Sequence, residues 1–441
     1  MESMKQQLKL NSFFAGIGGF DLGLARSGIE VGFHCEISPF CQSVLKRHWP
    51  DTPDISDITS VDAMSLPDAE IWSGGFPCQD VSVARGWLGR DGLKGKRSGL
   101  FHAFLDLIAV RLPTIVLLEN VTGLLNSHGG LDFELVLKGL TDLGYGVAWR
   151  VLNSRYFGAP QSRPRVFVCA WYGSPSRAIR TLYERTISPR PGNERIGFLT
   201  PCKRTTSGAI VPEVAYCLAA TSGRHTGTDW SRSYVSYHDR VRRLTPSECE
   251  GLQGFPKDWT LPEPHIKLAE NELDSLRYTA LGNAVCVPVV EWIAKRVKKE
   301  WNRAATAEIT AADILIPFPT DQPKIPLRLG EVKESLGTFK WSSGGYAWKG
   351  DCILTAVSPS PVKPITHLFA DILEHKSVSA GHFLSPNAAE GILRRVHGQG
   401  RTLFAPLEQA LQRLADSQIK AVSKPGASIS FLELEQSLVC V

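Results

Sequence analysis

Apolar runs alternate with helical repeats through the first third of the chain. The runs at residues 8–14, 31–35, 69–72 and 114–118 predict four short strands. Apolar residues at helical spacing predict helices at residues 20–26, 39–48 and 101–110. Strands that alternate with helices in this way indicate an α/β fold with a mostly parallel sheet, wound on both faces.

Glycines and an acidic residue lie where the first two predicted strands end. Gly16, Gly18 and Gly19 follow the first strand and open a helix, as glycines do in nucleotide-binding loops. Glu36 ends the second strand, where an acidic residue commonly takes a ribose hydroxyl. The loop lacks the spacing of the dinucleotide fingerprint, so a plain tight turn is the alternative for the glycines.

A cysteine follows the third predicted strand. Residues 74–82 read Gly-Gly-Phe-Pro-Cys-Gln-Asp-Val-Ser, so Pro77 restricts the backbone directly before Cys78. A thiol at such a corner is placed for nucleophilic attack. A single free cysteine is more often a small buried hydrophobe, so other motifs have to decide between the two interpretations.

Composition narrows the class of protein. The 441 residues, 43% hydrophobic and 21% charged, are enough for two or three globular domains. No run of 18 apolar residues is present and the first residues lack a signal-peptide pattern, so we expect a cytoplasmic protein without a membrane partner. The ten cysteines include no C-x-x-C pair, and we expect neither a metal site nor a disulfide framework.

Positive charge is concentrated in the middle of the chain. Residues 163–243 hold fourteen Lys or Arg against five Asp or Glu, whereas the last 141 residues hold fourteen against thirteen. A basic middle segment favours a polyanionic partner, and an ordinary solvated surface is the alternative.

Eight short motifs resemble those of the DNA cytosine carbon-5 methyltransferases and follow the order of that family across residues 8–300. One such motif has a real false-positive risk, but eight in order make a chance match negligible. They are FAGIGG at 14–19, GFPCQ at 75–79, RSGLF at 97–101, ENV at 119–121, QSRPRVF at 161–167, RLTP at 243–246, EGLQGFP at 250–256 and LGNAV at 281–285.

The resemblance implies a Rossmann-like, S-adenosylmethionine-dependent methyltransferase sheet. Residues 8–169 with 278–300 would form the catalytic and cofactor-binding domain, residues 170–277 a small irregular target-recognition domain, and residues 302–441 a C-terminal extension of unknown role. The implied partner is double-stranded DNA, bound by a monomer in a bacterial cell or a phage-infected host, in restriction–modification or phage anti-restriction. Arg394, Arg395 and Arg401 of the extension are candidate contacts to DNA or a partner, with a packing appendage as the alternative.

The resemblance also assigns catalytic roles. The Cys78 thiolate would add to carbon 6 of a flipped cytosine, so that carbon 5 can attack the methyl donor. Glu119 would protonate ring nitrogen N3, which requires a raised pKa in a closed site. Arg163 and Arg165 would hold the base and stabilise the transition state. The alternatives are a helix-capping carboxylate for Glu119 and surface ion pairs for the arginines, and no residue is identified as the base that removes the carbon-5 proton.

The remaining expected contacts follow from the same resemblance. For Asp57, a turn residue in an Asp-rich loop is the alternative. The expected DNA contacts are Gln79, Ser82 and Arg97 in a basic glycine-rich loop, and Arg224 and Arg232 in the basic middle segment. The expected cofactor contacts are Phe14, Gly16, Gly18, Gly19, Glu36, Asp57, Ile58, Asn283 and Ala284.

Two other functions fit parts of this pattern. An RNA cytosine methyltransferase could use the same scaffold, and a DNA-binding protein that has lost activity could retain it. The Pro77-Cys78-Gln79 tripeptide and the basic segment favour DNA over RNA. The intact set of Cys78, Glu119, Arg163 and Arg165 favours an enzyme over a binding protein.

Overall fold

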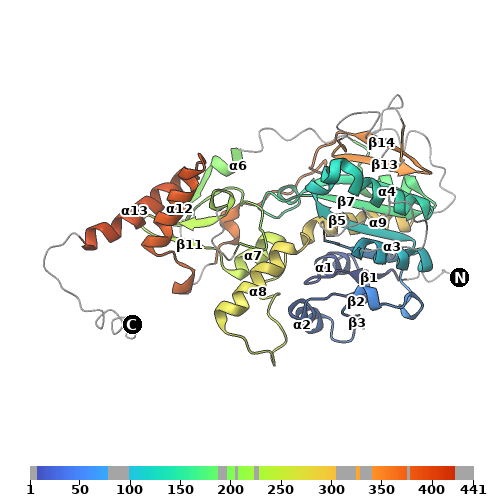
Figure 1. Ribbon diagram of the computed structural model, residues 1–441, viewed down its shortest axis with the longest axis horizontal. Coiled ribbons are helices and arrows are strands. Elements are labelled where there is room, and N and C mark those ends of the chain that lie inside the picture. Colours follow the sequence, from blue (N-terminus) through green and yellow to red (C-terminus); the bar gives the residue numbers. More distant parts are fainter. Residues whose placement is uncertain are drawn as a thin grey trace.

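Two sheets divide the protein into a larger and a smaller lobe (Figure 1). The computed structural model describes residues 7–77, 99–186, 196–203, 207–222, 228–303, 324–327, 340–374 and 378–422. Within these residues no helix combines the length and the apolar composition needed to cross a membrane.

The large sheet has the strand order β12-β14-β13-β6-β7-β5-β4-β1-β2-β3. β7 (Pro164–Tyr172) is antiparallel to β5, and β6 (Tyr145–Asn153) is antiparallel to β7. The prediction of a Rossmann-like α/β sheet is confirmed, because the four expected strands all lie in its parallel half. That half consists of β1 (Lys9–Phe13), β2 (Glu30–Cys35), β3 (Asp54–Ile55), β4 (Ile71–Gly74) and β5 (Ile115–Val121).

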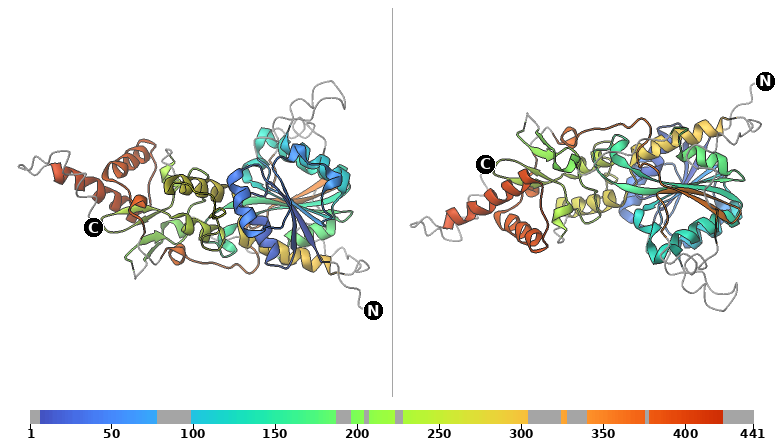
Figure 2. Two further views of the ribbon diagram at one scale, coloured as in Figure 1. Left: turned by 90° about the horizontal axis from the view of Figure 1, so that it is seen from below. Right: turned by 90° about the horizontal axis from the view of Figure 1, so that it is seen from above.

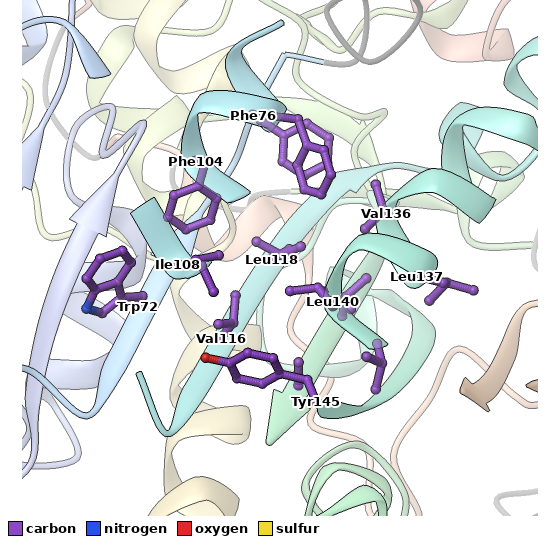
Figure 3. Close-up of a cluster of buried hydrophobic side chains, with 14 of the residues drawn as sticks. Trp72, Phe76, Phe104, Ile108, Val116, Leu118, Val136, Leu137, Leu140 and Tyr145 are labelled. Carbon is purple, nitrogen blue, oxygen red and sulfur yellow. The ribbon is translucent and has the colours of Figure 1, made fainter. Parts of the chain in front are cut away.

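Helices cover both faces of this sheet. On one face, α3 (Leu100–Arg111) and α4 (Leu131–Asp142) bury their apolar sides against strand residues such as Trp72 and Val116 (Figure 3). On the other face lie α1 (Gly19–Ala25), α5 (Pro175–Leu182) and α9 (Val287–Trp301), packed against Ile71 and Ile115. Successive strand residues point to opposite faces, so Ile71 and Trp72 belong to different cores. The helix α2 (Pro39–His48) follows β2.

The small lobe contains an antiparallel sheet in the order β11-β10-β9-β8. Its strands are three residues each: β8 (Pro201–Lys203), β9 (Ile210–Pro212), β10 (Tyr234–Ser236) and β11 (Val241–Arg243). Its helices are α6 (Ile196–Leu199), α7 (Pro246–Gln253) and α8 (Glu270–Asn283).

Short 3-10 helices occur in both lobes. They are η1 (Ile58–Ser60), η2 (Ala63–Ser65), η5 (Thr122–Leu125), η6 (Ser127–Gly130), η7 (Ser154–Tyr156), η8 (Asp229–Ser231), η9 (Phe369–Ile372) and η10 (Ala380–His382).

The C-terminal region is distributed over both lobes. β12 (Ile325–Pro326), β13 (Gly344–Trp348) and β14 (Asp351–Thr355) extend the large sheet, with β13 antiparallel to β6. The helices α12 (Pro386–Gly398) and α13 (Ala405–Val422) pack on the small sheet. Figure 2 shows them at the end of the molecule that lies away from the large sheet.

Candidate active site

A cavity of about 530 Å³ opens at the carboxyl ends of the parallel strands. Its volume lies in the range of small-molecule sites, and this edge is where open α/β sheets bind ligands. Its wall is formed mainly by the ends of the parallel strands and the segments that follow them, and by the second half of α8. They are Phe14, Gly16, Cys35, Glu36, Ile37, Ser38, Phe40, Cys41, Ser56, Asp57, Ile58, Gly75, Phe76, Pro77, Leu100, Glu119, Asn120, Val121, Arg163, Arg165, Leu276, Thr279, Ala280, Gly282, Asn283 and Ala284.

The carboxylate of Glu36 is held by the backbone on two sides. Oε2 accepts from Gly16 N at 2.7 Å, and Oε1 accepts from Ser38 N at 2.8 Å. The Glu36 carbonyl oxygen accepts from Gln42 Nε2 at 2.5 Å. A carboxylate oxygen has more than one acceptor site, so both oxygens can still accept from a ligand hydroxyl.

The three glycines after β1 have different surroundings. Gly16 lines the cavity with a φ of +56°, and a Cβ there would meet nothing within 4 Å. Gly18 and Gly19 are not among the lining residues. A Cβ on Gly18 would lie 2.6 Å from the Trp49 ring, and one on Gly19 would lie 2.6 Å from Val285 Cγ1. These two glycines therefore allow the start of α1 to pack closely, and only Gly16 borders the open space.

Asp57 and Ile58, which follow β3, line the cavity near Glu36. Asp57 begins η1 and accepts from Thr59 N at 2.9 Å and Thr59 Oγ1 at 2.8 Å. These two hydrogen bonds lower the pKa of Asp57 and keep its carboxylate charged. The end of α8 adds the exposed Asn283 and the buried Ala284. Seven of the nine expected cofactor contacts thus share one cavity, all except Gly18 and Gly19.

Glu119 lies two residues before the end of β5, with its carboxyl group buried at the cavity wall; the residue is 8% exposed. Burial raises its pKa, and the nearby charges of Arg165 and Arg163 oppose that shift without cancelling it. Arg165 Nε lies 3.1 Å from Glu119 Oε1, and a Cβ on Gly75 would lie 4.0 Å from Oε2. The carboxyl can therefore hold a proton at a pH where an exposed glutamic acid has lost it, directly beside the loop that follows β4.

Arg163 is 2% exposed, and its guanidinium group donates hydrogen bonds to backbone carbonyl oxygens. Nη1 donates to Leu218 O at 2.8 Å, and Nη2 donates to Ala284 O at 2.8 Å and Gly282 O at 3.0 Å. Gln161, two residues earlier, donates to Leu252 O and accepts from Leu218 N. Both side chains thus join the segment before β7 to the small lobe, and Arg163 also joins it to the end of α8.

Asn120 is a site residue that the sequence argument did not single out. Its Nδ2 donates to Phe76 O at 2.9 Å, and its Oδ1 accepts from Val121 N at 2.9 Å. The end of β5 is thereby tied to the backbone two residues before Cys78. Its place in the motif, next to Glu119, was the available signal.

Several expected residues lie outside the described part of the chain, which reaches the cavity at Pro77. They are Cys78, Gln79, Ser82, Arg97 and Arg224. Arg232 is described and lies in the small lobe, where its Nη2 donates to Thr221 Oγ1 at 3.2 Å. It lines a separate small pocket together with Tyr216 and Cys217.

Two thiols of the described residues line the cavity, those of Cys35 and Cys41. Burial raises the pKa of each to about 12, with the Glu36 charge adding to the shift. Because the thiolate is the reactive form, both are poor nucleophiles near neutral pH. Among the described residues, no group of three or more His, Cys, Asp or Glu is placed to hold a metal ion.

Known methyltransferases are similar to about two thirds of the chain. The family model for C-5 cytosine-specific DNA methylase matches residues 8–197 and 203–299. The type II methyltransferase M2.BsuMI of Bacillus subtilis is 31% identical over 306 residues, covering 66% of this chain and 76% of that protein. The type II methyltransferase M.NgoBI of Neisseria gonorrhoeae is 30% identical over 307 residues, covering 64% and 90%. Among solved structures, the S. pombe Dnmt2 methyltransferase matches 67% of this chain and all of its own, at 19% identity and a TM-score of 0.49.

Proposed function

Because the chain belongs to the C-5 cytosine-specific DNA methylase family and is a DNA cytosine-5 methyltransferase, we propose that its 530 Å³ cavity is where the methyl group is transferred. The observation that carries this proposal is that the expected catalytic acid and the expected cofactor contacts line the same cavity. The buried carboxyl of Glu119, whose pKa is raised by burial, lies in the same cavity as Glu36 and Asp57, and the chain that leads to Cys78 borders it at Pro77.

The donor side of the cavity fits S-adenosylmethionine, the methyl donor that the family implies. The Glu36 carboxylate is fixed by Gly16 and Ser38 and can accept from ribose hydroxyls. The charged Asp57 can accept from an amino group on the adenine, with Ile58 as an apolar wall. Gly16 leaves open space at the centre. When bound, S-adenosylmethionine supplies an electrophilic methyl group.

On the substrate side, Cys78 is the proposed nucleophile. Its sulfur bonds to carbon 6 of the cytosine, and the displaced ring electrons make carbon 5 nucleophilic. Glu119 donates its proton to N3 as negative charge develops on the ring. Once carbon 5 carries the methyl group, a base that the sequence does not identify takes the carbon-5 proton. The electrons of that C–H bond restore the double bond between carbons 5 and 6, and the sulfur leaves carbon 6 as thiolate. N3 then returns its proton to the Glu119 carboxylate, which restores the starting site. The target base has to leave the helical stack to reach this site.

The two arginines have separate roles in this proposal. Arg165 lies beside Glu119, so its charge stabilises the carboxylate that remains after the proton has left. Arg163 donates its N–H groups to three backbone carbonyls. We therefore assign Arg163 to holding the cavity walls together, which differs from the expectation that it contacts the base.

We further propose that the enzyme methylates a fixed DNA sequence. The relatives M2.BsuMI and M.NgoBI are type II methyltransferases, which favours a restriction–modification role over phage anti-restriction. The small lobe, with Arg232, is the proposed reader of that sequence, because arginine can read guanine in the major groove.

Transfer of label from S-adenosylmethionine to duplex DNA of mixed sequence tests the proposal, with bisulfite sequencing to locate the modified cytosines. We expect label in DNA from the wild-type protein and none from Cys78→Ala. Cys202→Ala, which removes a thiol on β8 in the small lobe, is the matched control and should retain activity. Undiminished label with Cys78→Ala would contradict the proposed nucleophile, and label in RNA but not in DNA would contradict the substrate.

A further inference from the structure

The C-terminal region is built into the small lobe as well as the large sheet. Phe383 forms an antiparallel bridge with Arg242, and Leu384 N donates to Val241 O at 2.9 Å, so this segment extends the β11 edge. Ile392 of α12 and Leu407 of α13 are buried in one apolar cluster with Tyr234 and Val241. The core of the small lobe is therefore completed by residues more than 130 positions later in the chain.

Two arginines of this region hold the short helix η8. Arg395 Nε donates to Asp229 Oδ2 at 2.9 Å, and Asp229 is fully buried. The other Asp229 oxygen accepts from the Tyr234 hydroxyl at 2.9 Å. Arg401 places its guanidinium carbon 4.6 Å from the centre of the Trp230 ring, a cation–π contact. Both Arg395 and Arg401 thus contact protein side chains that adjoin the proposed DNA reader.

The segment after η8 leads toward the catalytic cavity. Arg232 N donates to Asp229 O at 3.2 Å, and the Ser233 hydroxyl accepts from Tyr216 N at 2.8 Å. Cys217 follows Tyr216 in the chain, and its sulfur lies 3.4 Å from Arg163 Nη1 and 3.8 Å from Arg165 Nη2. A continuous series of contacts therefore runs from α12 through Arg232 to the arginines of the cavity.

We propose that Arg395 and Arg401 are positioning residues for DNA-site selection, acting on Arg232 through η8. This inference rests on the proposed function of the small lobe as the DNA reader. A side chain that reads a base has to be held within a fraction of an ångström by its surroundings. The three-residue elements η8 and β10 are too short to supply this rigidity themselves, and the C-terminal helices supply it.

The experiment compares the full-length wild type with Arg395→Gln and Arg401→Gln. Bisulfite sequencing of mixed-sequence DNA gives the ratio of methylation at the preferred site to methylation elsewhere, and initial rates give the KM for DNA. We expect the site ratio to fall, or the DNA KM to rise, by about tenfold, the value of one good base contact. Affinity for S-adenosylmethionine should not change, because Glu36 and Asp57, the residues proposed to bind it, lie just after β2 and β3 in the large lobe.

Matched variants separate positioning from folding. Arg394→Gln removes the same charge from the exposed neighbour on α12 and should behave as wild type. Arg395→Lys retains the charge and should recover most of the site ratio. The effects of Asp229→Asn and Arg395→Gln should be non-additive in the double variant. If Arg395→Gln does not fold, Arg401→Gln decides alone, since it removes a contact made by an exposed side chain.

Two results would overturn the inference. One is a wild-type site ratio and DNA KM in both Arg395→Gln and Arg401→Gln. The other is a parallel loss of donor affinity and activity with the site ratio unchanged, which would indicate a structural role only. Absence of DNA methylation by the wild type would instead contradict the proposed function.

Discussion

Two glutamate–arginine pairs, one at the cavity and one in the small lobe, have very different surroundings. In the small lobe, Arg242 donates to both oxygens of Glu248 at 2.8 Å. The Glu248 oxygens also accept from Thr245 N and Glu374 N, each at 2.9 Å. Burial alone would lower the pKa of Arg242, but its hydrogen bonds to Glu248 outweigh burial and raise it. This pair is fully satisfied and holds the start of α7 and residue 374 together.

In the pair at the cavity, Glu119 and Arg165, the carboxyl oxygens are not all hydrogen-bonded. Glu119 Oε1 lies 3.1 Å from Arg165 Nε, but the oxygen makes no well-directed hydrogen bond within the described structure. Burial therefore raises the pKa of Glu119 in spite of the neighbouring charge. The comparison shows that the same two residue types serve structure when every oxygen is paired. At the cavity, the Glu119 carboxyl keeps one oxygen without a hydrogen bond, which fits the proton transfer proposed for it.

Glu119→Gln should have the largest effect on activity. We expect the methylation rate to fall by about 10²–10⁴-fold, the usual contribution of a general acid, with no loss of thermal stability. Initial rates of label transfer and thermal unfolding check this. A rate within a few fold of wild type would show that Glu119 does not supply the proton.

Glu248→Gln should affect stability instead. Removing one partner of a buried pair costs about 3–5 kcal/mol, because the Arg242 charge is left without compensation. Urea unfolding measures this change. Asp142→Asn breaks the exposed pair between Lys138 and Asp142 and should change the free energy of unfolding by less than about 0.5 kcal/mol. Equal changes in the free energy of unfolding of Glu248→Gln and Asp142→Asn would contradict a structural role for the buried pair.

The glycines give a third test, of intermediate size. Gly19→Ala brings a Cβ against Val285 and should destabilise the fold by about 1–3 kcal/mol. Gly16→Ala meets no atom, so its cost is the positive φ, roughly 1–2 kcal/mol, together with a methyl group at the cavity wall. Urea unfolding and titration with S-adenosylmethionine should show the larger loss of donor affinity for Gly16→Ala. A larger loss for Gly19→Ala would mean that Gly19 contacts the donor.

The pH dependence of stability gives the smallest effect. With a raised pKa, folded Glu119 binds more protons than the unfolded chain, so wild-type stability falls as pH rises from 4.5 toward the raised value. Glu119→Gln has no titrating group at this position, so its stability lacks this pH dependence. The unfolding temperature of Glu119→Gln relative to wild type should therefore increase with pH across that window. A constant difference between the two proteins would contradict a raised pKa.

Four of the five strands in the parallel half of the large sheet, all except β3, could be predicted from sequence, because each is a short apolar run followed closely by glycine or glutamate. Glu36 and Glu119 follow such runs, and the chain order alone places both at one edge of the sheet. The position of Gly16 followed from the same pattern. Gly18 and Gly19 could not be separated from Gly16, since their contacts with Trp49 and Val285 arise only in the folded protein.

The role of the C-terminal region could not be predicted. β13 pairs with β6 although their residues are almost 200 positions apart, and local periodicity carries no information on such pairing. The pair Arg395–Asp229 has the same origin, so Arg395 was indistinguishable in sequence from its exposed neighbour Arg394. Arg163 shows a related limit: its motif identified the residue, but its backbone partners depend on where residues 218 and 282–284 lie.

Capture of the covalent bond between Cys78 and the base tests the proposed nucleophile directly. A duplex with 5-fluorocytosine at the methylated position has no proton on carbon 5, so the step that releases Cys78 is blocked. Mass spectrometry of the protein after incubation with this duplex and S-adenosylmethionine should find one adduct, on Cys78, and none in Cys78→Ala. Wild-type protein that methylates the normal duplex but forms no adduct, or forms it on another cysteine such as Cys217, would contradict the account.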